Sequence, residues 1–109
     1  MIAKTPEPPY YAVIFTNVQT NELKGYAEMA DRMLELAKLQ PGYLGFESAR
    51  DEIGIAVSYW KDKESILNWK QQVDHCLAQK MGLEKWYSDY STRIAKVERA
   101  YSKGTSTLS

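Results

Sequence analysis

The sequence has a single cysteine, no net charge and no long apolar stretch. Cys76 alone excludes an intrachain disulfide and fits a reducing compartment. Fourteen basic and fourteen acidic residues cancel, and no cluster of Lys and Arg favours binding to nucleic acid or to an anionic membrane. The longest apolar run is too short to span a bilayer, and the N-terminus lacks the apolar region of a signal peptide. We therefore expect a cytoplasmic protein that binds neither nucleic acid nor membrane.

Several familiar catalytic motifs are also missing. The chain has no P-loop, no glycine-rich dinucleotide fingerprint and no nucleophile elbow. Its one histidine, His75, has no neighbouring Cys or carboxylate at metal-ligand spacing, so we expect no metal site. Aromatic residues, in contrast, are plentiful, with eight Tyr, three Trp and two Phe. Rings in this number can fill a core, bridge a dimer or line an apolar pocket.

The hydrophobic pattern predicts one α+β domain over residues 10–101. An extended, poorly ordered lead-in is expected at 1–9 and a flexible polar tail at 102–109. Runs rich in β-branched and aromatic residues predict strands at 10–18, 43–51, 55–60 and 90–101. Apolar residues at three- and four-residue spacing predict helices at 24–39 and 62–72, with Asp62 as a helix cap and Asp74 opening a separate helical piece.

The resulting order, β-α-β-β-α-β, predicts a ferredoxin-like fold. Right-handed crossovers place both helices on one face of a four-stranded antiparallel sheet. The first strand is apolar on both sides, so the other face of the sheet is expected to be apolar and uncovered. A bare apolar sheet is an association surface. We therefore predict that two sheets pack face to face in a homodimeric α+β barrel.

A series of short motifs resembles the antibiotic-biosynthesis-monooxygenase family. The first is the Pro-Gly-Tyr-Leu-Gly run at 41–45, followed by the Tyr-Trp pair at 59–60. Trp69 and then His75 complete the pattern, and the resemblance covers roughly residues 10–98. It implies a dimeric α+β barrel with a pocket between sheet and helices in each subunit. Some members of this family oxidise polycyclic aromatic substrates with O₂ and no cofactor, whereas others bind and break down haem.

The resemblance also nominates catalytic residues. In the haem-degrading branch the site consists of an Asn on the first strand, a Trp on the second helix and a His about ten residues later. Asn17 and Trp69 match the first two, but Gln79 stands at the third position and His75 comes six residues after Trp69. That departure disfavours haem, and we expect no cofactor.

Each nominated residue has a structural alternative. The amide of Asn17 would orient O₂ or a substrate oxygen, or it would satisfy backbone groups at a strand end. Trp69 would form the wall of an aromatic pocket, or simply part of the core. His75 would act as the base that ionises a phenolic substrate, or it would be a solvated side chain beside Asp74.

Three hypotheses for function remain open at this point. The first is a cofactor-independent monooxygenase acting on a small aromatic or polycyclic substrate. The second is a haem-binding or haem-degrading monooxygenase. The third is a non-catalytic dimer that binds a small aromatic molecule in the same pocket.

Overall fold

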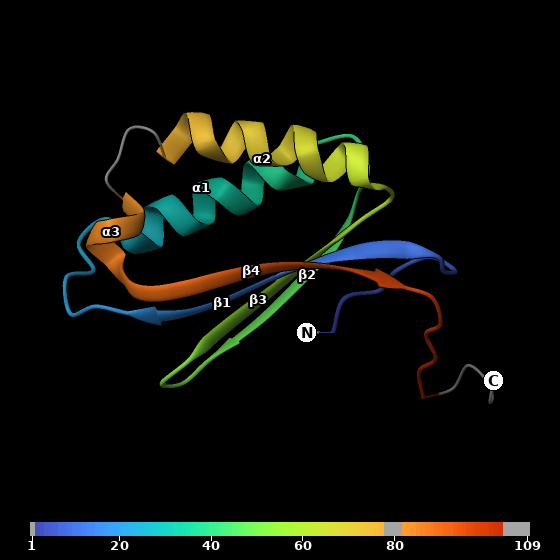
Figure 1. The fold of residues 1–109 in the computed structure, drawn as a ribbon, viewed down its shortest axis with the longest axis horizontal. Coiled ribbons are helices and arrows are strands. Elements are labelled where there is room, and N and C mark those ends of the chain that lie inside the picture. Colours follow the sequence, from blue (N-terminus) through green and yellow to red (C-terminus); the bar gives the residue numbers. More distant parts are fainter. Residues whose placement is uncertain (1, 78–81, 104–109) are drawn as a thin grey trace.

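The computed structural model describes residues 2–77 and 82–103, with side chains for 2–74 and 84–103. The elements, in chain order, are β1 (Tyr10–Gln19), α1 (Tyr26–Lys38), β2 (Tyr43–Arg50), β3 (Gly54–Trp60), α2 (Lys63–Leu77), α3 (Gly82–Trp86) and β4 (Tyr87–Val97). The strands form one antiparallel sheet in the order β2-β3-β1-β4. Helices α1 and α2 lie on one face of this sheet (Figure 1). The predicted ferredoxin-like βαββαβ fold is therefore confirmed.

Strand β1 lies at the centre of the sheet, hydrogen-bonded to β3 on one side and to β4 on the other. Because successive side chains of a strand point to opposite faces, its odd- and even-numbered residues separate. Tyr11 and Val13 pack against the core beneath the helices, so the odd-numbered residues as far as Asn17 share the helix-facing side. Ala12 and Ile14 share the opposite, open side. The run of β-branched and aromatic residues explains why this segment is extended.

Glycines set the two ends of the α1 region. Gly25, with φ +82°, precedes α1 in a left-handed conformation that glycine adopts without a Cβ penalty. After the helix, Gly42 has φ +88°, and a side chain there would overlap Ser65 of α2. The apolar residues that recur at three- and four-residue spacing in this helix are Tyr26, Met29, Ala30, Met33, Leu36 and Ala37. All of these except the exposed Ala30 are buried or half-buried.

Helix α2 begins as predicted but continues further. The Asp62 carboxylate accepts hydrogen bonds from the backbone N–H (2.8 Å) and the hydroxyl (2.7 Å) of Ser65, which confirms the cap. The prediction of a helix end near residue 72 and a new start at Asp74 is wrong. Asp74 lies inside α2, where it forms an (i, i+4) ion pair with Lys70 at 3.0 Å.

The core centres on Trp60, which is fully buried at the end of β3. Its ring stacks on Trp69 of α2 (5.8 Å between centroids, 23° between planes) and meets the ring of Tyr43 edge-on. Ala37 and Ile66 complete the buried cluster. This packing joins α1 and α2 to the half of the sheet where β3 ends.

The open face of the sheet carries the N-terminal segment (Figure 1). Ala3 donates its backbone N–H to the Glu47 carboxylate at 2.8 Å, and the Tyr59 hydroxyl donates to the other oxygen of that carboxylate at 2.7 Å. The Ala3 hydrogen bond, followed by that of Tyr59, lowers the pKa of Glu47 below its ordinary value. Elsewhere on this face Ile55 is 45% exposed. Among the described residues, no helix is long and apolar enough to cross a membrane.

Candidate functional site

Four residues, one from each strand, form a row across the helix-facing side of the sheet. The register pairs Asn17 of β1 with Tyr90 of β4 on one side and with Gly54 of β3 on the other. Gly54 in turn pairs with Arg50 of β2. The row therefore runs Tyr90–Asn17–Gly54–Arg50, and three separate strand pairings hold it in place. We call this set the Asn17 row.

Asn17 is a buried polar group that uses only half of its hydrogen-bonding capacity among the described residues. Its side chain is only 3% exposed, and its Oδ1 accepts a hydrogen bond from the Arg50 guanidinium. The Nδ2 hydrogens find no acceptor within the described part of the chain. A buried donor without a partner costs about 1–3 kcal/mol, a cost that a ligand oxygen would remove. Asn17 is thus suited to bind an oxygen atom from a ligand.

Arg50 reaches Asn17 because position 54 lacks a side chain. A Cβ built on Gly54 would overlap the guanidinium of Arg50. The charge of Arg50 has no carboxylate within ion-pair distance among the residues that the structure describes. The row therefore presents the positive charge of the exposed Arg50 and the amide donor of the buried Asn17 side by side.

Aromatic rings surround this polar pair. Phe15 of β1 meets Tyr87 edge-on at 5.3 Å and Tyr90 at 5.8 Å, measured between ring centroids. Tyr26 of α1 contacts Tyr87 at 6.0 Å and Trp86 at 5.7 Å. The Tyr90 side chain is 47% exposed, so its ring is available for stacking. Such a ring cluster provides the apolar surface that a flat aromatic ligand needs.

Tyr87 stays protonated and is therefore a poor candidate for a base. Burial is the main cause that raises its pKa well above the ordinary value, and the hydrogen bond to the Tyr26 hydroxyl adds to it. The nearby charge of Arg50 opposes this rise. A neutral hydroxyl can donate a hydrogen bond, but it does not accept a proton readily.

The structure does not bring Trp69 to the Asn17 row. Trp69 stacks on Trp60, which pairs with Tyr11 across β1 and β3. Tyr11 precedes Asn17 by six residues, which is about 20 Å along a strand. Trp69 is therefore a core residue at the other end of the sheet.

His75 lies on the backbone of α2, and its side chain is outside the described residues. The helix is unbroken from Lys63 to Leu77, so position 75 is about 180° around its axis from the buried Ile66. Helix α2 terminates on the side of the molecule where α3 lies (Figure 1). Position 75 shares that end with the Asn17 row, but on a side of α2 different from that of Ile66.

Haem fits this arrangement poorly. The Asn and Trp that match the haem-degrading branch lie at opposite ends of the sheet, since Trp69 packs on Trp60. The third position of that pattern, Gln79, lies outside the described residues. No group of three or more His, Cys, Asp or Glu in the described chain could hold a metal ion.

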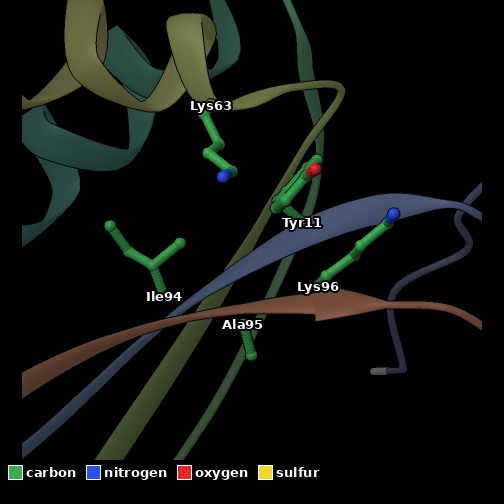
Figure 2. A pocket seen from close by; sticks show the side chains of 5 residues that line it. All are labelled: Tyr11, Lys63, Ile94, Ala95 and Lys96. Carbon is green, nitrogen blue, oxygen red and sulfur yellow. The ribbon is translucent and has the colours of Figure 1, made fainter.

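A separate open pocket of about 390 Å³ lies between the start of α2 and β4, and Figure 2 shows its five lining side chains. They are Tyr11, Lys63, Ile94, Ala95 and Lys96. The Lys63 ammonium lies 5.8 Å from the centre of the Tyr11 ring. Both lysines are exposed, so the pocket offers hydrated, mobile cations rather than fixed donors. Neither Asn17 nor Trp69 is among these five residues.

Sequence reasoning missed Arg50, Gly54 and Tyr90. The first two border a turn of polar residues, and their pattern indicated only a hairpin. Tyr90 is one of the many aromatic residues that the composition allows in a core, a dimer contact or an apolar pocket. An arginine next to such a turn and a glycine at the start of the following strand were the available signals.

Comparison with known proteins places this geometry in context. No family model matches the chain. The protein YqjZ of Bacillus subtilis is 49% identical over 100 residues, which make up 90% of this chain and 88% of YqjZ. The chain belongs to the same family as YqjZ. The jasmonate monooxygenase ABM of Pyricularia oryzae is 29% identical over 93 residues, 80% of this chain but only 43% of that protein. The chain spans less than half the length of this second relative.

Solved structures extend the likeness at the level of fold. A candidate antibiotic biosynthesis monooxygenase from Nitrosomonas europaea superimposes with a TM-score of 0.65 at 14% identity, over 86% of this chain and 94% of that one. A dimeric ferredoxin-like protein from an uncultured marine organism gives a TM-score of 0.64 at 13% identity, over 86% and 98%. This chain therefore shares its fold with a candidate antibiotic biosynthesis monooxygenase, as its motifs indicated.

Proposed function

We propose that this protein is a cofactor-independent monooxygenase acting on a small aromatic or polycyclic substrate between the sheet and the helices. The observation that carries the proposal is the buried Asn17 amide, whose Nδ2 hydrogens face no described acceptor beside a cluster of aromatic rings. The fold shared with monooxygenases supports it, as does the relative named a jasmonate monooxygenase. In this proposal the rings bind the flat body of the substrate, and Asn17 orients an oxygen atom.

The proposed reaction needs no external reductant. A CH₂ group that is conjugated with a carbonyl through an aromatic ring loses a proton to the solvent, which gives an electron-rich anion that reacts with O₂. One oxygen atom becomes a new carbonyl on that carbon, and the other leaves as water with the two hydrogens of the CH₂ group. The substrate thus supplies all the electrons. Asn17, by donating to the oxygen that carries the developing charge, would lower the barrier.

Anthrone, a tricyclic compound with such a CH₂ group, is a direct probe of the proposal. We expect the protein to accelerate O₂ uptake and the appearance of anthraquinone, in equal amounts, above the rate in buffer. Asn17→Ala should lower the accelerated rate at least about tenfold, because one charge-stabilising donor is lost. The exposed Asn68 of α2 offers a matched control, and Asn68→Ala should react like the parent. No acceleration by the parent protein would contradict catalysis on this substrate type.

The alternative of a non-catalytic binder is separated by the same experiment. Binding of an aromatic ligand without any O₂ uptake would favour it over an enzyme. Asn17 would then hold a ligand oxygen without a reaction, and Asn17→Ala would weaken binding rather than turnover.

We also propose a homodimer in which two open sheet faces pack together. The open face carries Ile55 (45% exposed) and, in the next row on the same face, the register pair Ile14 and Val57. An apolar surface of this kind is rarely left uncovered in a soluble protein. The dimeric ferredoxin-like structure with the same fold supports the assembly. Residues 3–5 would then lie at the border of the interface.

A further inference from the structure

The Asn17 row contains a positive charge that the proposed reaction does not yet use. Arg50 donates to Asn17 Oδ1 across Gly54, and no described carboxylate neutralises it. An arginine whose only task was to satisfy Asn17 Oδ1 would be an unusual choice, because a neutral donor serves an amide oxygen equally well. The remaining guanidinium hydrogens have no described acceptor. They are free for a ligand.

We propose that Arg50 and Asn17 together bind the anionic oxygen of an aromatic ligand, a carboxylate or an ionised phenol or enol. The proposal rests on the proposed function for the identity of the site and adds the chemical class of the substrate. Two donors of different kinds, the guanidinium and the Asn17 amide, are held next to each other, and charge-assisted hydrogen bonds are the stronger kind. A neutral hydrocarbon would leave both unpaired.

The surroundings of the pair fix the orientation of such a ligand. Tyr90 stands in the same row on the other side of Asn17, with Phe15 beside it. A flat molecule lying on these rings would direct a substituent along the row toward Asn17 and Arg50. In that position Arg50 would favour the ionised form of a hydroxyl, because an adjacent positive charge lowers the pKa of an acid. Arg50 would thereby also stabilise the anion that reacts with O₂.

Binding of 2-naphthoate and of 2-naphthamide tests the inference, because the two probes have nearly the same shape and differ in charge. We expect calorimetric titration at neutral pH to show about tenfold tighter binding of naphthoate. Arg50→Met should abolish this preference, and Arg50→Lys should keep part of it, since a lysine retains the charge but not the fork of donors. A third probe, 2-naphthol, should ionise at lower pH when bound than when free, by its absorbance.

A second variant guards against an effect of folding alone. Gly54→Ala leaves Arg50 in the chain but puts a Cβ where its guanidinium lies, so it should also remove the preference for naphthoate. Arg32 of α1 is exposed, and Arg32→Met should bind both probes like the parent. Far-ultraviolet circular dichroism would verify that each variant is folded.

The outcomes separate this inference from the proposed function. Equal binding of naphthoate and naphthamide by the parent, no binding of either, or an unchanged preference in Arg50→Met would each overturn the role of Arg50. Oxidation of anthrone at an undiminished rate by Arg50→Met would also overturn it, while leaving the monooxygenase proposal intact. If naphthoate binding depended on Arg50 but no probe caused O₂ uptake, the result would support the anion site formed by Arg50 and Asn17. It would also favour a non-catalytic binder over an enzyme.

Discussion

The guanidinium of Arg50 occupies the space that a side chain at position 54 would need. Glycine is unfavourable within a strand because it adds conformational entropy to the unfolded chain and has no side chain to pack. At position 54 the missing side chain lets an arginine from the neighbouring strand reach Asn17 on the strand beyond. Gly54 thus makes β3 locally less stable, but it allows the hydrogen bond between Arg50 and Asn17.

The cap of α2 gives a prediction that depends on pH. Hydrogen bonds from the Ser65 hydroxyl, then from the Ser65 backbone, lower the pKa of Asp62 from the ordinary 3.8. A carboxylate with a lowered pKa in the folded state stabilises the protein above its unfolded pKa, and this contribution is lost as pH falls through the folded value. We expect Asp62→Ala to lower the melting temperature at neutral pH by a few degrees.

The difference between Asp62→Ala and the parent should shrink once the pH falls below the unfolded pKa. Thermal melts at a series of pH values measure it. Asp62→Asn keeps an acceptor that does not titrate, so it serves as the control. A difference that stayed constant down to the lowest pH would show that the carboxylate charge plays no part in the cap.

Trp69 offers a test of its place in the core. Removing a large ring that stacks on the fully buried Trp60 leaves a cavity, so Trp69→Ala should lower the free energy of unfolding by about 3 kcal/mol. Denaturant titration measures the loss. The exposed neighbour Leu67 provides a control, and Leu67→Ala should change stability by no more than about 0.5 kcal/mol.

Trp69→Phe should restore most of the stability and bind naphthoate with the affinity of the parent. Because Trp69 lies at the opposite end of the sheet from Asn17, we expect no coupling between the two. A loss of naphthoate affinity in a well-folded Trp69→Phe protein would instead return Trp69 to the ligand site.

The base role proposed for His75 from sequence is also testable. Position 75 lies on the side of α2 opposite Ile66, so we expect His75→Gln to leave the melting temperature and the rate of anthrone oxidation unchanged. The pH dependence of the rate is the decisive readout, since a base near neutrality would produce a clear inflection. Disappearance of such an inflection in His75→Gln would establish His75 as the proton acceptor.

The open sheet face predicts the oligomeric state. Light scattering after size-exclusion chromatography should give about twice the 12.5 kDa chain mass. Ile55→Asp places a charge on the open face that forms the proposed interface and should produce a monomer, because an unpaired buried charge is costly. Leu67→Asp adds the same charge on the exposed side of α2 and should remain dimeric. A parent protein that ran as a monomer would refute the barrel.

The sequence predicts the order of elements well because their signals are local. The aromatic and β-branched run at 10–18, the Asp62 cap and the Pro41-Gly42 break each act within a few residues, and each is found in the structure. Asp74 was misread because its side chain can either cap a new helix or pair with a lysine one turn earlier. The presence of Lys70 favours the second.

The Asn17 row could not be predicted in the same way. Asn17 and Arg50 are 33 residues apart, and their contact depends on the register of two strand pairings together with an empty position at Gly54. Neither register nor the direction of a long side chain is encoded locally. The resemblance to known proteins pointed to Asn17, whereas its partners became visible only in three dimensions.

Because each strand contributes one residue to the Asn17 row, the row forms only when all four strands pair in the correct register. A slip of one residue in any of the three pairings would turn a member of the row to the opposite face. A ligand such as naphthoate that binds there would then act as a reporter in refolding experiments. The signal from naphthoate binding would appear only once the last strand had docked. By then the circular dichroism signal of the helices would already have recovered.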